Sequence, residues 1–487
     1  MGEAVRFLLG HEPRELRALD PNLTVLNYLR EVERRTGTKE GCAEGDCGAC
    51  TVVLGELDRN RLYYRAVNAC ILFTPQLDGK QLITVEHRRR ADGSLHPVQQ
   101  AMVECHGSQC GFCTPGFVMS LFALYHSERA PARQLILDTL AGNLCRCTGY
   151  RPIVDAARRM HELGADDQFS AREAETIRQL QALGRADRLA FDHRGKRYFA
   201  PRRIEDLAAL CEQFPSACLL AGGTDVGLWV TKQHRDLDTL IYVGAVEELR
   251  RLEVTDSHLE IGAAVTYTDA LDALGARWPD FGELIRRLGS VQIRNSGTIG
   301  GNVANGSPIG DSMPALIALG AELVLRKGAA RRTLALEDFD LDYRKTALQP
   351  GEFVERIRVP LPQAEHQFRC YKIAKRFDQD ISALLGAFRI QLEQGSVTNV
   401  RIAYGGMAAI PARLRECEQA LRGRPWTAAT VARGREALAR ELAPISDMRA
   451  SAAYRLLAAQ NLLTKFYLET NTPTPATRVL ELEVSHG

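Results

Sequence analysis

The sequence predicts a multidomain α+β protein. At 487 residues the chain is long enough for about three or four domains of ordinary size. Charged residues make up 25% and hydrophobic residues 45%, which are ordinary globular values. Runs with strand-like patterns and runs with helical periodicity follow one another along the chain. The net charge of +2 gives no whole-chain argument for binding nucleic acid or an anionic membrane.

The N-terminus and the hydropathy pattern predict a cytoplasmic location. Glu3 stands where a secretion signal would carry a basic residue. No apolar run reaches about 18 residues, so we expect no membrane span. Thiols stay reduced in such a compartment, so we expect no disulfide framework among the cysteines.

Cysteines are concentrated in the first third of the chain, where nine of the thirteen lie before residue 150. The stretch GCAEGDCGAC at 41–50 carries Cys42, Cys47 and Cys50, and Cys70 can supply a fourth thiolate. This C-x4-C-x2-C spacing is typical of a plant-type [2Fe–2S] cluster. The interleaved glycines can adopt positive φ and bring backbone N–H groups to the sulfurs. Zinc is the alternative, although structural zinc sites usually show two short C-x2–4-C pairs.

The segments around this loop predict a small strand-rich unit with one helix. Apolar residues recur at helical spacing over 24–32. Strand-like runs lie at 51–53, 65–70 and 82–86.

A second cysteine group lies among helices. Cys110 and Cys113 are followed, further on, by Cys145 and Cys147. Helix-like runs at 95–107, 117–127, 133–143 and 153–163 flank the two pairs, so two loops are expected to present four thiolates. This again fits a [2Fe–2S] cluster, with zinc as the alternative. The remaining cysteines are expected not to be ligands: Cys105, Cys211, Cys218, Cys370 and Cys417. The nearby histidines His87, His96 and His106 are expected to be turn or surface residues rather than ligands.

Beyond a charged linker at 163–190, two glycine-rich turns stand out at 219–230 and 294–321. Free backbone N–H groups in such turns can hold a pyrophosphate. Neither turn is G-x-G-x-x-G, and no adjoining βαβ unit fits the Rossmann fingerprint. The last region predicts strands at 370–376, 381–392 and 397–406, then helices at 411–442 and 448–468.

In order, these motifs resemble the iron–sulfur and flavin portions of the molybdenum hydroxylases, in the arrangement of the bacterial xanthine dehydrogenase type. The resemblance implies five parts: a ferredoxin-like β-grasp [2Fe–2S] domain at 1–86, a four-helix-bundle [2Fe–2S] domain at 87–162, the linker at 163–190, an α+β FAD-binding domain at 191–362 and an α+β C-terminal cap domain at 363–487.

The resemblance also implies a function. Electrons from a molybdenum–pterin centre on a partner subunit, which oxidises hypoxanthine or xanthine, would pass through both clusters to FAD and then to NAD. The partner would be the molybdenum-binding large subunit, in a heterodimer that pairs into an α2β2 heterotetramer. The equivalent subunit of an aldehyde or N-heterocycle hydroxylase is an alternative, and a zinc-stapled binding module is another.

The family's site residues transfer by position. The chain itself would supply no catalytic residue beyond the cofactors, with Arg376 and Asp380 as candidates near the flavin. Gln109 matches a contact to the pterin, and Leu288 stands where some relatives have an aromatic residue. The FAD contacts would be Leu220, Ala221, Gly222, Gly223, Thr224, Asp225, Val226, Leu288, Thr298, Ile299, Gly300, Gly301, Asn302, Asp311, Val354 and Lys372, and the cluster ligands the eight cysteines Cys42, Cys47, Cys50, Cys70, Cys110, Cys113, Cys145 and Cys147.

Overall fold

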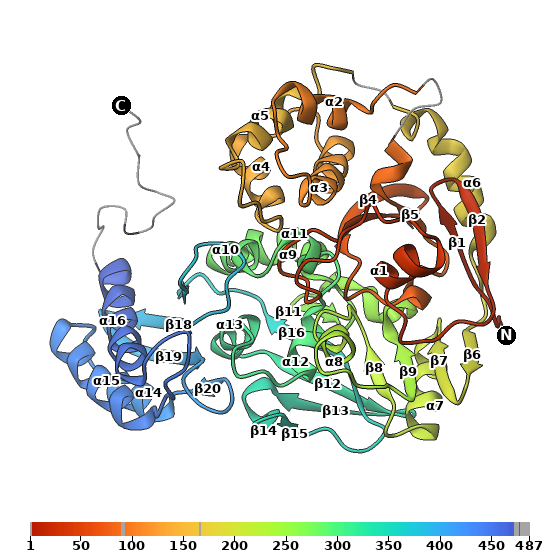
Figure 1. The fold of residues 1–487 in the computed structure, drawn as a ribbon. Helices are drawn as coiled ribbons and strands as arrows, with labels where there is room; N and C mark the ends of the chain where they lie inside the picture. Colours follow the sequence, from red (N-terminus) through yellow and green to blue (C-terminus); the bar gives the residue numbers. More distant parts are fainter. Residues whose placement is uncertain (1, 89–92, 165–166, 472–476, 478–487) are drawn as a thin grey trace.

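The computed structural model describes residues 2–88, 93–164 and 167–471, together with residue 477. The α+β architecture is arranged around a central two-sheet unit (Figure 1). The N-terminal sheet and the helices α2–α5 lie on one side of that unit, and the C-terminal sheet and its helices lie on the other.

The N-terminal unit is a five-stranded sheet in the order β2-β1-β5-β3-β4. Its strands are β1 (Val5–Leu9), β2 (Glu12–Leu16), β3 (Thr51–Asp58), β4 (Arg61–Asn68) and β5 (Gln81–Ile83). The predicted helix begins as α1 (Val25–Asn27), capped by Thr24, and continues as a π-helical turn over Tyr28–Val32. The strand predicted at 82–86 is too long, because the N–H of Thr84 donates to Nδ1 of His87 at 3.0 Å and the chain turns at Val85–Arg88.

In the helical unit, the structure has a helix at each of the four predicted helix-like runs. It consists of α2 (Pro97–Glu104), α3 (Thr114–Ser127), α4 (Arg133–Leu140) and α5 (Arg151–Arg159). The linker contains a further helix, α6 (Glu173–Leu183). One apolar core holds α2–α5 together.

The central unit has two sheets. The first, in the order β6-β7-β9-β8, contains β6 (Leu189–His193), β7 (Lys196–Ala200), β8 (Cys218–Leu220) and β9 (Thr239–Tyr242), with α7 (Ile204–Gln213) and α8 (Val226–Thr231). The second, in the order β10-β11-β16-β12-β13, contains β10 (Leu252–Val254), β11 (His258–Gly262), β12 (Glu322–Lys327), β13 (Ala330–Ala335) and β16 (Phe353–Pro360). Helices α9 (Tyr267–Arg277), α10 (Pro279–Arg287), α11 (Val291–Arg294), α12 (Ile299–Ala304) and α13 (Ser312–Leu319) and the hairpin β14 (Asp340–Asp342) and β15 (Lys345–Thr346) complete it.

Strands β8 and β9 run parallel with α8 between them in the chain, so a βαβ unit is present although the Rossmann fingerprint is not. The first glycine-rich turn joins β8 to α8. Sequence patterns did not reveal this unit because β8 and β9 are short, at 3 and 4 residues.

The C-terminal unit is the antiparallel sheet β17 (His366–Ile373), β18 (Leu384–Glu393), β19 (Ser396–Gly405) and β20 (Ala412–Arg413). It is covered by α14 (Arg415–Leu421), α15 (Ala428–Glu441) and α16 (Ala452–Asn471). The single helix predicted over 411–442 is thus two helices. The chain turns at Gly423, where φ is +72°, and Pro425 follows.

Two apolar cores cross the predicted boundaries between parts of the chain. The N-terminal sheet shares one core with β6–β9, in which Val5 and Leu82 pack with Leu189, Tyr198 and Leu240. A second core joins the central sheet β10–β16 to β17–β19. The five-part division of the chain therefore stays a prediction. In the structure, neighbouring parts share buried apolar side chains.

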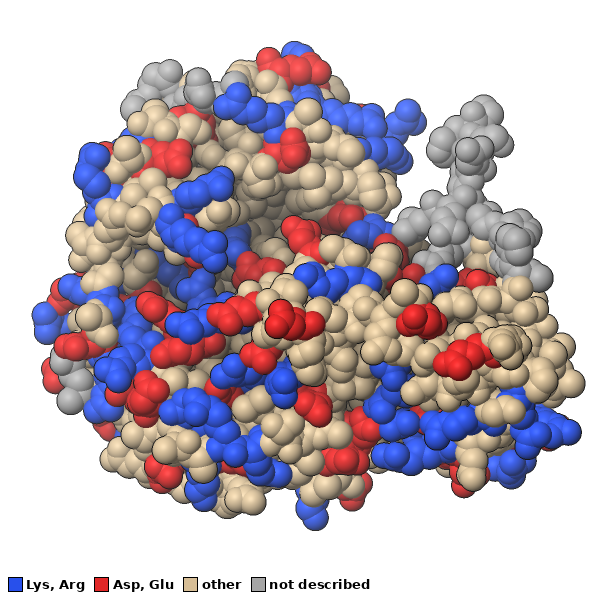
Figure 2. Space-filling model, turned by 180° about the vertical axis from the view of Figure 1, so that it is seen from behind, with Lys and Arg blue, Asp and Glu red and all other residues tan. Residues whose placement is uncertain are grey.

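The surface carries both signs of charge. Figure 2 shows acidic and basic side chains intermixed over one face, as the small net charge predicts. Among the described residues, no helix combines the length and the apolarity needed to cross a membrane.

A buried carboxylate fastens the linker to the helical unit. Asp167 Oδ2 accepts hydrogen bonds from Nε2 of His96 at 2.6 Å and Nε2 of His126 at 3.0 Å. Its Oδ1 accepts from the backbone N–H groups of Phe169 at 3.0 Å and Ser170 at 2.8 Å. Burial alone would raise the pKa of Asp167, but the hydrogen bonds from His126 and His96 outweigh it and hold that pKa well below its usual range. The expectation that His96 is a turn or surface residue is wrong, since its side chain is fully buried.

Two histidines and an aspartate could also form a metal site. However, Nδ1 of His96 accepts the N–H of Val98 at 3.2 Å, so the ring proton of neutral His96 is on Nε2 and points at Asp167. The group is therefore a hydrogen-bonded clasp.

We expect Asp167→Asn to lower the free energy of unfolding by about 3 kcal/mol at pH 7, because four donors lose a buried carboxylate. A folded-state pKa below the unfolded value gives stability that is present above about pH 4 and is lost as the pH falls further. The difference between wild type and variant in urea unfolding should therefore shrink at about pH 3.

Asp155→Asn is the matched control, since that side chain is 50% exposed and lies 4.0 Å from Arg158. Equal unfolding free energies for wild type and Asp167→Asn at pH 7 would show that the clasp contributes nothing.

Candidate cluster and flavin sites

The first cysteine group lies in a loop whose backbone N–H groups point at the cysteine sulfurs. The N–H groups of Glu44, Asp46 and Cys47 donate to Sγ of Cys42 at 3.4, 3.3 and 3.3 Å. The N–H of Cys42 donates to Sγ of Cys47 at 3.3 Å. Positive φ angles at Ala43, Gly45 and Gly48, of 55°, 80° and 70°, allow this winding.

The four thiols of this group converge in two contacting pairs. Cys42 is hydrogen-bonded to Cys47, and Cys50 to Cys70. The hydrogen bond from the Cys47 thiol, with the backbone N–H groups, holds the pKa of Cys42 well below its usual range. Four converging sulfurs with N–H groups directed at them form the donor set that a [2Fe–2S] cluster requires.

The second cysteine group lies at the N-terminal ends of two helices. Cys110 and Cys113 directly precede α3, and Cys145 and Cys147 precede α5. Their thiols pair across the two loops, Cys110 with Cys147 and Cys113 with Cys145. The four sulfurs thus come from both loops, as the sequence predicts.

Two side chains from the turn before α5 contact Cys145 of the second group. Oγ1 of Thr148 lies 3.2 Å from Sγ of Cys145, and the N–H of Cys145 donates to the hydroxyl of Tyr150 at 2.9 Å. Cys105 is instead the C-terminal cap of α2 and packs against the helical core.

The two cysteine loops meet in backbone contact. The N–H of Leu144 donates to the carbonyl of Cys47 at 3.0 Å. A Cβ added to Gly48 would lie 2.1 Å from the carbonyl oxygen of Gly142, and one added to Gly116 would lie 2.2 Å from that of Gly48. Only glycine permits this approach.

A buried polar network, which sequence analysis missed, holds this junction. Nε2 of Gln292 donates to Oγ of Ser120 at 3.0 Å, to Oδ1 of Asn143 at 3.1 Å and to Oγ1 of Thr51 at 3.3 Å. Nδ2 of Asn143 donates to the carbonyl of Gly48 at 3.1 Å. These side chains come from the N-terminal, helical and central units, so their contacts are not visible in local sequence patterns.

The two predicted flavin loops lie against each other. A Cβ on Gly222 would be 1.8 Å from the carbonyl oxygen of Ser296, so the first loop touches the segment that leads into the second. Thr298 caps α12 by accepting the N–H of Gly301 at 2.9 Å. Together the loops place glycine-rich backbone from two parts of the chain at one location.

Asp311 and Lys372, predicted as separate flavin contacts, form a buried pair. Nζ of Lys372 lies 2.5 Å from Oδ2 of Asp311, and the hydroxyl of Ser382 donates to Oδ1 at 2.6 Å. Both carboxylate oxygens of Asp311 therefore already have a partner within the protein. Val354 is buried in β16, and Leu288 ends α10 half-buried.

The charged segment 375–381 contacts the first cysteine loop. Oδ2 of Asp380 accepts the N–H groups of Lys375 and Arg376, each at 2.9 Å. Nε2 of Gln379 donates to Oδ1 of Asp46 at 3.1 Å and also to the Asp46 carbonyl, and Arg376 lies 3.8 Å from Asp46. Arg376 and Asp380 thus form part of a bridge to the cysteine loop. Gln379 was missed because nothing in its local sequence marks it.

Known domain families match the chain in the order of these sites. They are a 2Fe-2S iron–sulfur cluster binding domain at 10–73, a [2Fe-2S] binding domain at 84–158, an FAD binding domain in molybdopterin dehydrogenase at 190–362 and a CO dehydrogenase flavoprotein C-terminal domain at 369–470.

Curated relatives include xanthine dehydrogenases. That of Emericella nidulans is 32% identical over 483 residues, covering 87% of this chain and 35% of the relative. Xanthine dehydrogenase 1 of Arabidopsis thaliana is 32% identical over 479 residues, covering 83% of this chain and 35% of the relative. The chain therefore spans about a third of the length of these relatives. Among solved structures, carbon monoxide dehydrogenase from Hydrogenophaga pseudoflava is 30% identical with a TM-score of 0.53, covering 55% of this chain and 94% of that one.

The sites and the matching domains define an iron–sulfur flavoprotein of the oxidoreductase class. The chain belongs to the molybdenum hydroxylase family and carries its two [2Fe–2S]-binding domains, its FAD-binding domain and its C-terminal flavoprotein domain. This confirms the family and the fold class expected from the motifs.

We expect Gln292→Ala to loosen the junction between the cysteine loops. Three acceptors lose their shared donor, so the free energy of unfolding should fall by about 1–3 kcal/mol. Hydrogen exchange at the N–H of Leu144 should become faster, because that group bonds Cys47 beside the network.

Gln134→Ala is the control, since this helix residue is exposed and its side chain donates to Oδ1 of Asp138 at 2.7 Å, away from the network. Unchanged exchange at Leu144 in Gln292→Ala would mean that the network does not support the loop contact.

Proposed function

We propose that this chain is the electron-transfer component of an NAD-dependent xanthine dehydrogenase. Cys42, Cys47, Cys50 and Cys70 would hold one [2Fe–2S] cluster, and Cys110, Cys113, Cys145 and Cys147 the other. When bound, the clusters would exchange single electrons and FAD would couple them to hydride exchange with NAD. The family domains and the xanthine dehydrogenase relatives support this assignment.

The observation that carries the proposal is a series of contacts that links the second cysteine group to the first, and the first to the charged segment 375–381. The second cysteine group touches the first through the bond from Leu144 to Cys47, at 3.0 Å. The first touches the flavin-side segment through Asp46 and Gln379, at 3.1 Å. These contacts support an order in which the second group is outermost, the first group lies in the middle and the flavin loops come next.

The chain's own residues would tune the flavin site. Lys372 shares its charge with Asp311 at 2.5 Å, so the pair presents a dipole rather than a free cation. A paired lysine stabilises a reduced, anionic ring less than an unpaired one does. Residues 220–226 and 298–302 would supply backbone donors for the pyrophosphate.

The exposed face around the second cysteine group suits a partner subunit. Gln109 and Cys110 are exposed, Phe112 is 49% exposed and Tyr150 is 38% exposed. Apolar side chains beside an exposed cysteine pair are expected to be covered. We propose that the molybdenum-binding subunit docks here, in an α2β2 heterotetramer in the cytoplasm.

A second candidate is the equivalent component of another molybdenum hydroxylase. The structural likeness to carbon monoxide dehydrogenase favours this second candidate, because the match covers 94% of the chain of that enzyme. The two candidates are distinguished by measuring which substrate the assembled enzyme oxidises with NAD as acceptor: xanthine, an aldehyde or another N-heterocycle.

We expect Cys42→Ser and Cys110→Ser each to remove one cluster, so that iron and acid-labile sulfide fall from about four to about two per chain. Substrate-to-NAD turnover should stop in both variants. Reduction of artificial dyes by NADH should persist, because the flavin loops are untouched.

Cys105→Ser is the control and should keep full iron content, since Cys105 is no part of either group. Zinc without sulfide or flavin in the wild type would refute the cluster assignment altogether. Loss of NADH-to-dye activity in both variants with FAD still bound would refute the order of the sites.

We expect Lys372→Met to weaken FAD binding by about tenfold or more, because it leaves the buried Asp311 carboxylate without its cation. Flavin release can be followed by fluorescence during dialysis. Lys375→Met is the control, as its Nζ donates to the carbonyl of exposed Met448 at 2.6 Å and not to Asp311. Equal FAD retention in all three proteins would exclude Lys372 from the flavin site.

A further inference from the structure

Two consecutive peptide groups in the first cysteine loop point at the same sulfur. The N–H of Asp46 and the N–H of Cys47 each donate to Sγ of Cys42 at 3.3 Å. The carbonyl oxygens of these two peptide groups belong to Gly45 and Asp46. Hydrogen bonds in series polarise one another, so a donor bound to either carbonyl strengthens the N–H···S bond at the other end of that peptide group.

Each of the two carbonyls accepts a hydrogen bond from a side-chain amide. Nδ2 of Asn68 donates to the carbonyl of Gly45 at 2.7 Å. Nε2 of Gln379 donates to the carbonyl of Asp46 and, at 3.1 Å, to Oδ1 of the same residue. Asn68 is the last residue of β4, whereas Gln379 lies between β17 and β18. Two distant parts of the chain therefore make the same kind of contact with neighbouring peptide groups.

The oxygen ends of the two amides share a further feature. Oδ1 of Asn68 and Oε1 of Gln379 are buried, and within the described chain neither oxygen has a hydrogen-bond partner. An unpaired buried acceptor costs free energy, but turning either amide over would place its oxygen against a carbonyl oxygen. Gln379 also has a φ of +60°, in the left-handed region that residues other than glycine rarely adopt. Such costs are found mainly at functional sites, and here the donor end of each amide is the end in use.

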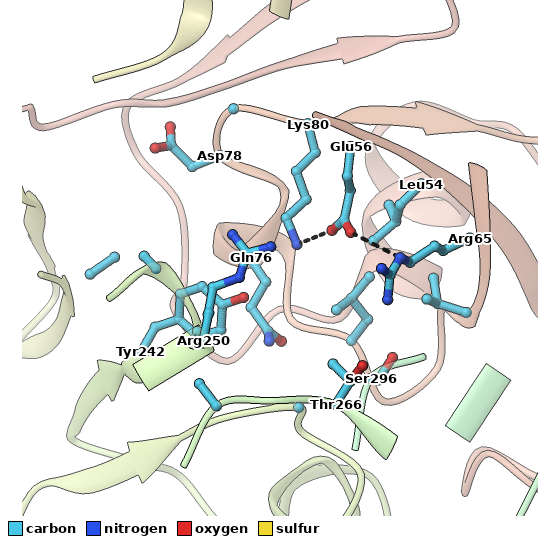
Figure 3. A pocket seen from close by; sticks show the side chains of 18 of the residues that line it. Leu54, Glu56, Arg65, Gln76, Asp78, Lys80, Tyr242, Arg250, Thr266 and Ser296 are labelled. Atoms are coloured by element: carbon cyan, nitrogen blue, oxygen red, sulfur yellow. Dashed lines mark ion pairs between the residues drawn. The ribbon is translucent and has the colours of Figure 1, made fainter. Parts of the chain in front are cut away.

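The charged side chains of β4 and its neighbours face a different way. Arg65 and Val67 line a cavity of about 320 Å³ between the N-terminal sheet and the central unit, which the flavin loops also line. Figure 3 shows Arg65 and Lys80 both directed at Glu56, and Lys80 lies 2.5 Å from it. Successive side chains of a strand point to opposite faces, so Asn68 and Val67 lie on opposite faces of β4. The polar group that the end of β4 directs at the cysteine loop is thus a neutral amide.

We propose that Asn68 and Gln379 are positioning residues that raise the reduction potential of the [2Fe–2S] cluster held by the first cysteine group. Each amide polarises a peptide group whose N–H donates to Cys42. Such donors favour the reduced cluster, because it carries more negative charge than the oxidised one. A higher potential at the first group would draw electrons from the second.

The inference rests on the proposed function, because it takes Cys42 as a cluster ligand. It goes further by giving the C-terminal unit a part in setting the potential of a cluster to which that unit supplies no ligand. The contact of Gln379 with Asp46 spans 333 positions of the chain, so this effect depends on how the C-terminal unit sits against the cysteine loop.

The test is a redox titration of the full protein, loaded with both clusters and FAD, in which electron paramagnetic resonance follows each reduced cluster. Cooperative strengthening amounts to about 10–30% of a hydrogen bond. For Gln379→Met we therefore expect the ratio of reduced to oxidised first cluster, at a fixed potential, to fall by about two- to fourfold. At about 59 mV per tenfold change for one electron, the midpoint falls by about 18–36 mV. Asn68→Leu should act in the same direction, and the second cluster should keep its potential in both variants.

Gln394→Met is the matched control. Gln394 is an exposed glutamine with a positive φ of 47°, in the turn between β18 and β19, and no described hydrogen bond joins it to the cysteine loop. Gln379 is only half-buried, so Gln379→Met decides the question by itself if Asn68→Leu, at a buried position, fails to hold its cluster.

Iron, acid-labile sulfide and flavin are measured in each protein before the titration. A wild type without clusters would overturn the proposed function, and this inference with it. With both clusters present, an unchanged potential of the first cluster in Gln379→Met would overturn the inference alone. Equal shifts of both clusters, or the same shift in Gln394→Met, would also overturn it, because they would show a general effect on the structure.

Discussion

The backbone contact between the two cysteine loops is the constraint on which the rest of the structure depends. Gly48, Gly116 and Gly142 bring the loops together at distances that exclude any Cβ, and the buried amide of Gln292 joins them to the central unit. A buried polar network is costly when any member lacks a partner. The N-terminal, helical and central units are therefore required to meet in one relative orientation.

Much of this organisation could be predicted from the sequence because its chemistry is local. The spacing from Cys42 to Cys50 encodes a loop that directs backbone N–H groups at sulfur, and the structure shows those bonds. Apolar periodicity predicts the helices around Cys110 and Cys145. Helix α3 consists mainly of apolar residues, and most of them are buried. Where ligands lie within a few residues, short-range patterns are sufficient.

The remainder could not be predicted because it depends on contacts between distant residues. His96 looked like a turn residue until Asp167, 71 positions away, was placed beside it. Gln379 and Asp46 are 333 positions apart, and nothing in the sequence around either residue indicates that the two meet. Asp311 and Lys372 were each expected to contact the flavin, but burial pairs them with one another first. A buried ion needs a partner, and the sequence alone does not say which one is nearest.

The core that the N-terminal sheet shares with β6–β9 has a consequence for biosynthesis. Val5 and Leu82 pack against Leu189, Tyr198 and Leu240, which a ribosome adds only after the helical unit has been made. The core of α2–α5, in contrast, draws only on residues before 164. We therefore expect the helical unit to become compact first during translation, while the N-terminal sheet waits with an uncovered apolar face that chaperones would recognise.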